Sequence, residues 1–498
     1  MSDNLMLPIF IVSPQVKTVD ILADTTFGED NDGLKNIKSA FLLFCQGNVD
    51  EAQSVCDTSG SAELDNVVLA LSKEVIDDFP VSDPRWAESI PAGGISASTS
   101  LIILHQLQDK LKAHSFMVEF LKSVGLWQKL GIVTFKEKPS LTCFLICEHA
   151  EKLSAAAALC KINKMYQEVV DESIKLVMKK RQVKSHVRGL TEQDLFFREV
   201  SMISDIFESL MDHEEEVLRK QKPSLTHLQT VVAVNTIMQE MLQEAWHYRQ
   251  TNFTAYRPSD ISIEFNTELM PWTATTGPSG VRSLLLKQVG LTAERGLTVN
   301  ADQQTLPLLV QQMVDLADIL LDGYVHQLQT IRTCPGMKSH YEEVSKQYEQ
   351  DRHTVILPLV QLGQRSHAAS LAEKYHDFGI LIELCESVGD QRTLQQYMTQ
   401  FSEEGFSDFL FKWYMDKGER QKLMTIPEPQ HEDLASFLSS HHHLRWLHDI
   451  HLKSFYQAYE ALKGLAINEA SYLARKKVTV ICSWLTGSVS LRNGFMVR

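Results

Sequence analysis

The sequence predicts an all-α protein built as an elongated, irregular, solenoid-like stack of helices. Three observations support this class. Apolar residues recur at helical spacing through much of the 498-residue chain, no series of alternating strands is evident, and turn residues separate the periodic segments. Because short helices cannot each bury an apolar face alone, neighbouring helices must cover one another.

The clearest helical pattern lies in residues 366–424, where four short amphipathic helices are expected with very short turns between them. Asp377, Asp390 and Ser407 stand where N-terminal caps are needed. Glycines stand where helices would end, at Gly389, Gly405 and Gly418. The apolar residues expected to share the helix faces are Ala368, Leu371, Ala372, Tyr375, Phe378, Leu381, Leu384, Cys385, Leu394, Tyr397, Met398, Phe401, Phe406, Phe409, Leu410 and Trp413.

Helical spacing also runs through the chain before this stretch. Helices are expected at 37–44, 64–75, 101–124, 141–162, 195–219, 226–249, 306–328 and 340–362. The helix at 101–124 is expected to line one side with Leu104, Leu107, Leu111 and Val118. Residues 131–140 are expected to form a loop, whereas 283–302 fits either a strand or a helix.

Breaks in composition predict the domain organisation. The expected parts are an irregular N-terminal lead-in at 1–33, a first helical stack at 34–260, an irregular connection at 261–305, a second helical stack at 306–477 and a divergent tail at 478–498. The tail contains neither an acidic residue nor clear 3.6-residue periodicity. No blade-like strand repeats occur, so no β-propeller is expected.

Composition narrows the function classes. The 48 Lys and Arg residues face 63 Asp and Glu residues, a formal net charge of −15, which argues against direct nucleic-acid binding because phosphate contacts need clustered cations. No run of 18 or more uncharged apolar residues occurs, so no membrane span is expected. The eight cysteines show no framework spacing and no secretory leader is expected, which favours reduced thiols in the cytosol or nucleus.

The segment 441–451 is the most tempting metal-site candidate, with His441, His442, His443, His448 and His451. On a helix, His448 and His451 share a face with Asp449 nearby. Zinc needs three or four converging ligands, and the HxxxH spacing that a helix uses for this is missing. The pattern therefore favours a solvated helix start and loop. No metal-binding, cofactor-binding or catalytic residue is predicted.

Three further features have unremarkable interpretations. Cys143 and Cys147, one helical turn apart, are expected to be buried small hydrophobic residues. His213 precedes the acidic run 214–216, which is expected to face solvent. The mixed-charge segment 178–194 is expected to be a solvated connection, with a basic docking patch as the alternative.

Sequence signatures of common enzymes are absent. The chain has no GxxxxGK[ST] or GxGxxG nucleotide-binding loop, no GxSxG nucleophile elbow and no HExxH metalloprotease motif. No pair of titratable residues stands out as an acid and base. We therefore expect a non-catalytic protein that needs no cofactor.

Several long segments are far more specific than a generic helix-pair pattern. They are DFPVSDPRWAESIP (78–91), TSLIILHQLQDKLKAHSF (99–116), ICEHAEKLSAA (146–156), FFREVS (196–201), PWTATTGPSG (271–280), LDGYVHQL (321–328), AASLAEKY (368–375) and YMTQFSEEGFSDFLFKWYMDKG (397–418). In order and spacing, from about residue 34 to residue 477, they resemble the helical region of the nucleoporin 133 family.

The resemblance implies a structural role in the Y-shaped subcomplex of the nuclear pore, in pore assembly, nucleocytoplasmic transport and mRNA export. It implies location at the nuclear envelope, and at the kinetochore in mitosis. The implied partners are other Y-complex nucleoporins. The family's contact to nucleoporin 107 comes from far C-terminal helices, whereas the similarity here stops near Lys477, so that contact stays open and no interface residue is carried over.

Two alternatives from other classes remain. A helical-repeat adaptor of the cytosol or nucleus would bind a peptide segment in a groove, which requires an unpaired apolar concave face. A metal hydrolase would use the histidine cluster, which requires stoichiometric zinc.

Overall fold

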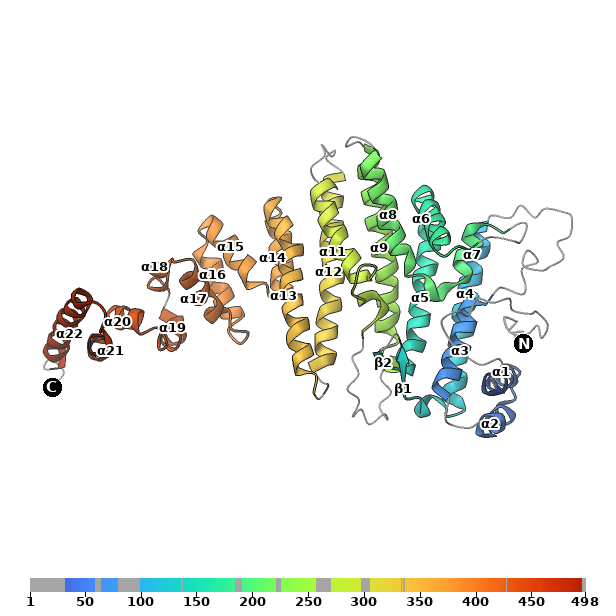
Figure 1. Ribbon diagram of the computed structural model, residues 1–498, viewed down its shortest axis with the longest axis horizontal. Helices are drawn as coiled ribbons and strands as arrows, with labels where there is room; N and C mark the ends of the chain where they lie inside the picture. Colours follow the sequence, from blue (N-terminus) through green and yellow to red (C-terminus); the bar gives the residue numbers. More distant parts are fainter. Residues whose placement is uncertain are drawn as a thin grey trace, which may run out of the picture. The chain divides into compact units, whose positions relative to one another are not determined.

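The computed structural model describes residues 32–58, 64–78, 99–135, 138–183, 190–220, 225–256, 270–296, 305–332, 334, 336–426 and 428–494. These residues are predominantly helical (Figure 1), so the prediction of an all-α helical stack is confirmed. The chain divides into two compact units, Met1–Pro358 and Leu359–Arg498, each with its own packing. The domain bounds expected from composition stay a prediction.

The first unit contains the longer helices. Its elements are α1 (Asp32–Cys45), α2 (Val49–Thr58), α3 (Leu64–Asp77), α4 (Thr99–Ser123), β1 (Ile132–Phe135), β2 (Lys138–Leu141), α5 (Thr142–Ile162), α6 (Gln167–Lys180), α7 (Glu192–Arg198), α8 (Asp205–Lys220), α9 (Leu225–Thr251), α10 (Phe253–Tyr256), α11 (Val281–Leu291), α12 (Thr305–Arg332) and most of α13 (Lys338–Gln361). Short single turns cover Trp127–Lys129 (η3), Val200–Met202 (η4), Trp272–Ala274 (η5) and Thr292–Gly296 (η6).

Helix α5 is the centre of the first unit. It packs against α3, α4 and α9, and α9 in turn packs against α12, as the adjacent ribbons in Figure 1 show. The buried apolar residues of α5 itself are distributed all around the helix. Ala155, Ala156 and Leu159 are among its completely buried side chains. A helix that is apolar all round must be enclosed by its neighbours, and the alanines allow those neighbours to approach closely.

One local prediction in the first unit is wrong. Residues 131–140 were expected to form a loop, but β1 and β2 pair there as an antiparallel hairpin with Ile132 opposite Leu141. The backbone nitrogen of Gly131 donates to Asp65 Oδ1 of α3 at 2.8 Å, which anchors the start of the hairpin. Of the ambiguous segment 283–302, residues 283–296 are helical in α11 and η6, and residues 297–302 lie outside the described residues.

The second unit is a series of short helices. They are α14 (Arg365–Tyr375), α15 (Phe378–Val388), α16 (Gln391–Gln400), α17 (Phe406–Asp416), α18 (Arg420–Leu423), α19 (His431–Leu438), α20 (His442–His451), α21 (Phe455–Asn468) and α22 (Leu473–Gly494), with a single turn, η7, at Glu428–Gln430. Successive contacts join α14 to α15, α15 to α16 and α17, and α19 through α20 and α21 to α22.

The turns of the 366–424 stretch follow the expected chemistry at two of three caps. Asp377 accepts from the backbone nitrogen of Ile380 at 3.1 Å, and Asp390 from that of Thr393 at 3.0 Å. Ser407 is not a cap. Gly405 precedes α17 with φ of +80°, a left-handed conformation that favours glycine, and Ser407 is buried in the first turn.

Tyrosine–glutamate hydrogen bonds join alternate helices of the same stretch. Tyr397 Oη of α16 donates to Glu373 Oε1 of α14 at 2.6 Å. Tyr414 Oη of α17 donates to Glu386 Oε1 of α15 at 2.5 Å. Each bond ties a helix to the next but one, so the register of the stack is fixed by polar contacts as well as by apolar packing.

Helix α22 covers most of the segment that the sequence suggested was a divergent tail without helical periodicity. It packs against α21 through small and polar residues. Ser483 and Thr486 are buried, and a Cβ atom on Gly487 would lie 3.0 Å from Cδ2 of Tyr459 on α21. Within the described residues, no helix has the length and hydropathy needed to cross a lipid bilayer.

Candidate functional site

The histidines of 441–451 form a cluster with one additional member. The ring of His431 on α19 lies 5.5 Å from that of His448 and 6.0 Å from that of His451, centroid to centroid. His448 is buried, so the prediction that the segment is solvated is wrong at this position. Leu444 lies one turn earlier on the same face of α20 and is also buried, so burial of this face places the His448 ring inside the protein.

This cluster gives no support to the metal alternative. Among the described residues, no three or more His, Cys, Asp and Glu side chains are grouped so that they could hold a metal ion. His431 Nε2 instead contacts the backbone oxygen of Ile426 at 2.8 Å. Burial, together with the neighbouring His431 and His451, lowers the pKa of His448, which favours a neutral ring.

Cys143 and Cys147 are both buried in α5 as free thiols, as predicted. Burial raises the pKa of the Cys143 thiol to about 11 and that of Cys147 well above its usual value. Metal binding and nucleophilic attack need the thiolate, so both residues are suited to packing and poorly suited to chemistry.

The acidic run 214–216 does not simply face solvent, because Glu214 is completely buried. Gln288 Nε2 of α11 donates to Glu214 Oε1 at 3.2 Å, and the same nitrogen donates to Asn235 Oδ1 of α9 at 2.8 Å. The second carboxylate oxygen of Glu214 has no hydrogen-bond partner within the described part of the chain. Burial raises the pKa of Glu214 to about 8, so the carboxyl group is largely protonated at neutral pH.

The raised pKa predicts a pH-dependent stability of the first unit. Since the folded pKa of about 8 exceeds the reference value of 4.5, the folded state binds the proton more tightly. The contribution of this protonated carboxyl group to the free energy of unfolding is complete below pH 4.5, and it is lost as the pH rises to 8. Within that window the free energy of unfolding should fall by roughly 1.4 kcal/mol per pH unit from this group. Glu214→Gln should flatten this slope in denaturant titrations, whereas Glu240→Gln, at an exposed position on α9, should leave it unchanged.

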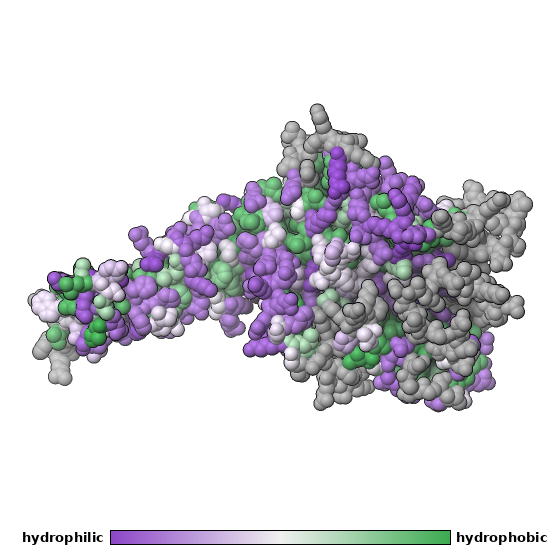
Figure 2. Space-filling view, in the orientation of Figure 1, coloured by the Kyte–Doolittle hydropathy of each residue, from purple (hydrophilic) through white to green (hydrophobic). Residues whose placement is uncertain are grey.

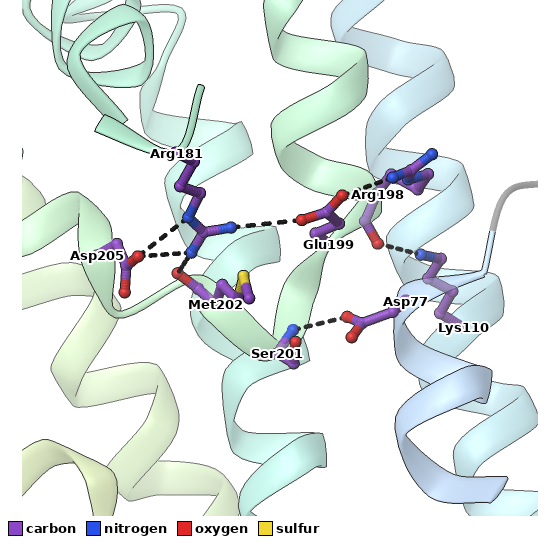
Figure 3. Close-up of polar contacts among 8 residues, drawn as sticks. All are labelled: Asp77, Lys110, Arg181, Arg198, Glu199, Ser201, Met202 and Asp205. Carbon is purple, nitrogen blue, oxygen red and sulfur yellow. Dashed lines mark hydrogen bonds and ion pairs between the residues drawn. The ribbon is translucent and has the colours of Figure 1, made fainter. Parts of the chain in front are cut away.

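Lys110 of α4 is the most deeply buried lysine or arginine of the described residues and lies where α3, α4 and α7 meet (Figure 3). Its Nζ donates to the backbone oxygens of Ile76 at 2.7 Å and Arg198 at 2.8 Å. Burial lowers the pKa of Lys110 to about 8, although Asp77 opposes this effect. Asp77 Oδ1 accepts from the backbone nitrogen of Ser201 at 2.8 Å, so two side chains of opposite charge anchor the same connection between α7 and α8.

Arg181, directly after α6, completes this network from the other side (Figure 3). Its guanidinium donates to Asp205 Oδ2 at 2.7 and 3.0 Å and to the backbone oxygen of Met202 at 3.0 Å. It also donates to Glu199 Oε2 at 3.4 Å. Lys180 and Arg181, both in the mixed-charge segment 178–194, are therefore held in ion pairs. These pairs weaken the alternative that the two residues form a basic docking patch. Residues 184–189 of the segment lie outside the described part.

A buried ion pair joins α5 to α9. Glu151, fully buried on α5, accepts from Arg249 Nε at 2.8 Å and from Nη2 at 2.5 Å. Trp272 Nε1 of η5 donates to Glu151 Oε2 at 3.0 Å. This bidentate pair with an added indole donor is typical of a stable internal joint rather than of a reactive carboxylate.

A cavity of about 190 Å³ lies between α9, η5, α11 and α12. Trp246, Arg249, Arg282, Asp318 and Asp322 are among its lining residues. Typical ligand pockets measure roughly 300–1,000 Å³, so this cavity suits one side chain or a few waters, not a helical peptide. The groove-binding adaptor thus has no matching cavity here.

Ser72 is the described hydroxyl that most resembles a nucleophile beside a base. Its Oγ lies 2.7 Å from His149 Nδ1 and 3.2 Å from His114 Nε2. Ser72 is completely buried and His114 nearly so, and burial lowers the pKa of both imidazoles. A substrate could not reach this hydroxyl without unfolding the helices around it, so we interpret the trio as a polar contact within the core.

The comparisons with known proteins point to one family. Residues 237–479 match the family model described as the non-repetitive/WGA-negative nucleoporin C-terminal. The chain is 43% identical to nuclear pore complex protein Nup133 of Homo sapiens, over 92% of this chain and 40% of the relative. It is 41% identical to Nup133 of Danio rerio, over 98% of this chain and 43% of the relative. Nup133 of Drosophila melanogaster is 27% identical over 91% of this chain.

These relatives confirm the resemblance found in the sequence. The chain spans about 40% of the length of the curated vertebrate relatives that it matches. The matched part coincides with helices in both compact units, since the family model begins within α9 and ends within α22.

Proposed function

We propose that the chain belongs to the nucleoporin 133 family and is a structural scaffold subunit of the nuclear pore complex. The observation that supports this proposal most directly is the match to Nup133 proteins at 41–43% identity over nearly the whole chain. Its place would be the nuclear envelope, within the Y-shaped subcomplex of the outer rings. Through that role it would support pore assembly, nucleocytoplasmic transport and mRNA export.

The mechanism is non-catalytic and depends on protein–protein contacts. Glu151, Lys110 and Arg181 each tie two or more helices of the first unit together. In the second unit, the tyrosine–glutamate bonds join alternate helices. Such internal ties favour a stiff stack that holds its surface residues at fixed positions, which is what a scaffold needs to position its neighbours.

Affinity capture tests this proposal. The whole chain, tagged and expressed in cells, should recover other nucleoporins of the Y-shaped subcomplex in stoichiometric amounts. The Phe406→Ala variant is expected to disrupt the second unit and should therefore reduce recovery. If the folded chain recovers no nucleoporin, the scaffold proposal is wrong for this chain.

A further inference from the structure

Helix α22 presents an inverted distribution of side chains. Its small and polar residues face α21, where Ser483 and Thr486 are buried and a Cβ atom on Gly487 would crowd the Tyr459 ring. Its large apolar residues face outward. They are Leu473, Val478, Val480, Ile481, Trp484, Leu485, Val489 and Leu491, all at least 40% exposed, with Trp484 at 70%. Figure 2 shows hydrophobic residues exposed in this terminal part of the second unit.

We call these eight residues the outer face of α22. At 100° per residue they spread over about half of the helix circumference. Ordinary surfaces contain isolated apolar residues, whereas a contiguous set of this size on one helix marks an interaction site. The face is also convex, because it is the outward side of a single helix.

The charge of α22 restricts what can cover this face. Residues 470–494 contain four basic residues, Arg475, Lys476, Lys477 and Arg492. They contain no acidic residue, since the last one in the sequence is Glu469. Arg475 Nη1 bonds to Glu469 Oε2 at 3.2 Å, which leaves Lys476 and Lys477 as cations with no competing carboxylate within the helix. In a chain of net charge −15, this helix is a cationic exception.

We propose that the outer face of α22 docks on an anionic lipid surface, with the helix lying in the plane of the membrane interface. Apolar side chains and an exposed tryptophan on one side, with lysines and no acidic residues, are the features of interfacial helices. The helix need not cross the bilayer, in agreement with the hydropathy of the described helices. This inference is independent of the pore assignment.

Two other occupants fit less well. A second copy of the chain would bring two cationic helices together, which costs electrostatic energy in an apolar interface. A partner helix from another protein would cover a stripe of about 100°, and so would leave much of the outer face exposed. Lys477 lies one turn after Leu473 and one before Ile481, inside the apolar face. In a protein interface it would need a buried carboxylate, whereas at a membrane its long side chain reaches the lipid phosphates.

Vesicle flotation with the whole purified chain tests this proposal. The probes are vesicles of phosphatidylcholine alone and of equal parts phosphatidylcholine and phosphatidylserine. We expect binding to the anionic vesicles, weakened by salt, and little binding to the neutral ones. Lys476→Ala with Lys477→Ala should weaken binding roughly 30-fold, since each cation near an anionic surface contributes about 1 kcal/mol. Lys346→Ala with Lys412→Ala, at exposed positions on α13 and α17, should have no effect.

A second pair of variants isolates the apolar part of the contact. Trp484→Ser with Leu485→Ser should abolish flotation, whereas Tyr456→Ser with Ile467→Ser, similarly exposed on α21, should not. All four positions are exposed, so circular dichroism and thermal unfolding should match the parent chain. Equal binding to neutral vesicles, or flotation that survives the Trp484→Ser and Leu485→Ser substitutions, would overturn the proposal. A dimer in light scattering that the same two substitutions dissociate would assign the face to a second copy instead.

Discussion

Replacing Glu151 with alanine is expected to lower the free energy of unfolding of the first unit by about 3–5 kcal/mol. Glu151 is fully buried, and its carboxylate accepts two hydrogen bonds from Arg249 and one from Trp272. Its removal would leave the Arg249 guanidinium largely buried without its counter-charge. A buried charge that loses its counter-charge costs far more than an ordinary lost contact, because the guanidinium remains largely removed from bulk water.

Hydrogen exchange in α5 and α9 would measure this loss, because it reports on the two helices that the pair joins. The control is Glu172→Ala, which removes an exposed ion pair with Lys175 on α6 and should change stability by less than about 1 kcal/mol. Equal small effects for both variants would show that the buried pair does not stabilise the joint between α5 and α9.

Phe406→Ala is expected to destabilise the second unit by about 3–5 kcal/mol. Phe406 is completely buried at the start of α17, and its ring centroid lies 5.1 Å from that of Phe378 in an edge-to-face arrangement. It also lies 6.1 Å from Tyr397 and 6.3 Å from Phe401. The truncation would leave a cavity between three helices that short turns hold in place, so the site cannot easily collapse.

Phe409 is the matched control for this variant. It belongs to the same helix and contacts Phe378 at 5.9 Å, yet its side chain is 43% exposed. Phe409→Ala should therefore cost about 1 kcal/mol or less. Hydrogen exchange in α15, α16 and α17 distinguishes the two variants. Comparable losses of protection in Phe406→Ala and Phe409→Ala would mean that burial of the side chain does not control the stability of the second unit.

Apolar periodicity predicted the helices well where buried faces are apolar. In α17, residues 406, 410 and 414 lie one turn apart and are all buried, so the segment was correctly predicted as a helix. Within it, Phe409 was expected on the inward face and is instead partly exposed. With five aromatic residues in eleven, the helix offers more apolar side chains than one face can hold, and the sequence alone does not rank them.

The same rule failed where polar residues occupy buried faces. Helix α4 was expected to line one side with Leu104, Leu107, Leu111 and Val118. Leu107 is buried, but the other three are only partly buried, and the buried face also includes Lys110, His114 and Met117. A lysine and a histidine on that face conceal its register. Their partners, the backbone oxygen of Arg198 and the hydroxyl of Ser72, lie far away in the sequence. Only the fold reveals the partners of these two buried polar side chains.

Two buried titratable residues could have been found by extending the periodicity through polar positions. Glu214 falls seven residues after Phe207 and three after Met211, on the apolar face of α8. His448 falls four after Leu444 on α20. Helix α22 is the reverse case: serine, threonine and glycine face α21, and the large apolar residues lie on the exposed side, so the apolar pattern does not mark the buried side of this helix.

The fraction of the tagged chain at the nuclear rim tests the scaffold account most directly. The whole chain, fused to a fluorescent protein at its N-terminus and expressed at low level, should give punctate rim staining that coincides with other nucleoporins and exchanges slowly after photobleaching. Phe406→Ala should reduce that rim signal while Phe409→Ala should retain it. Diffuse staining of the intact, folded chain, with rapid recovery after photobleaching, would contradict its role as a pore scaffold subunit.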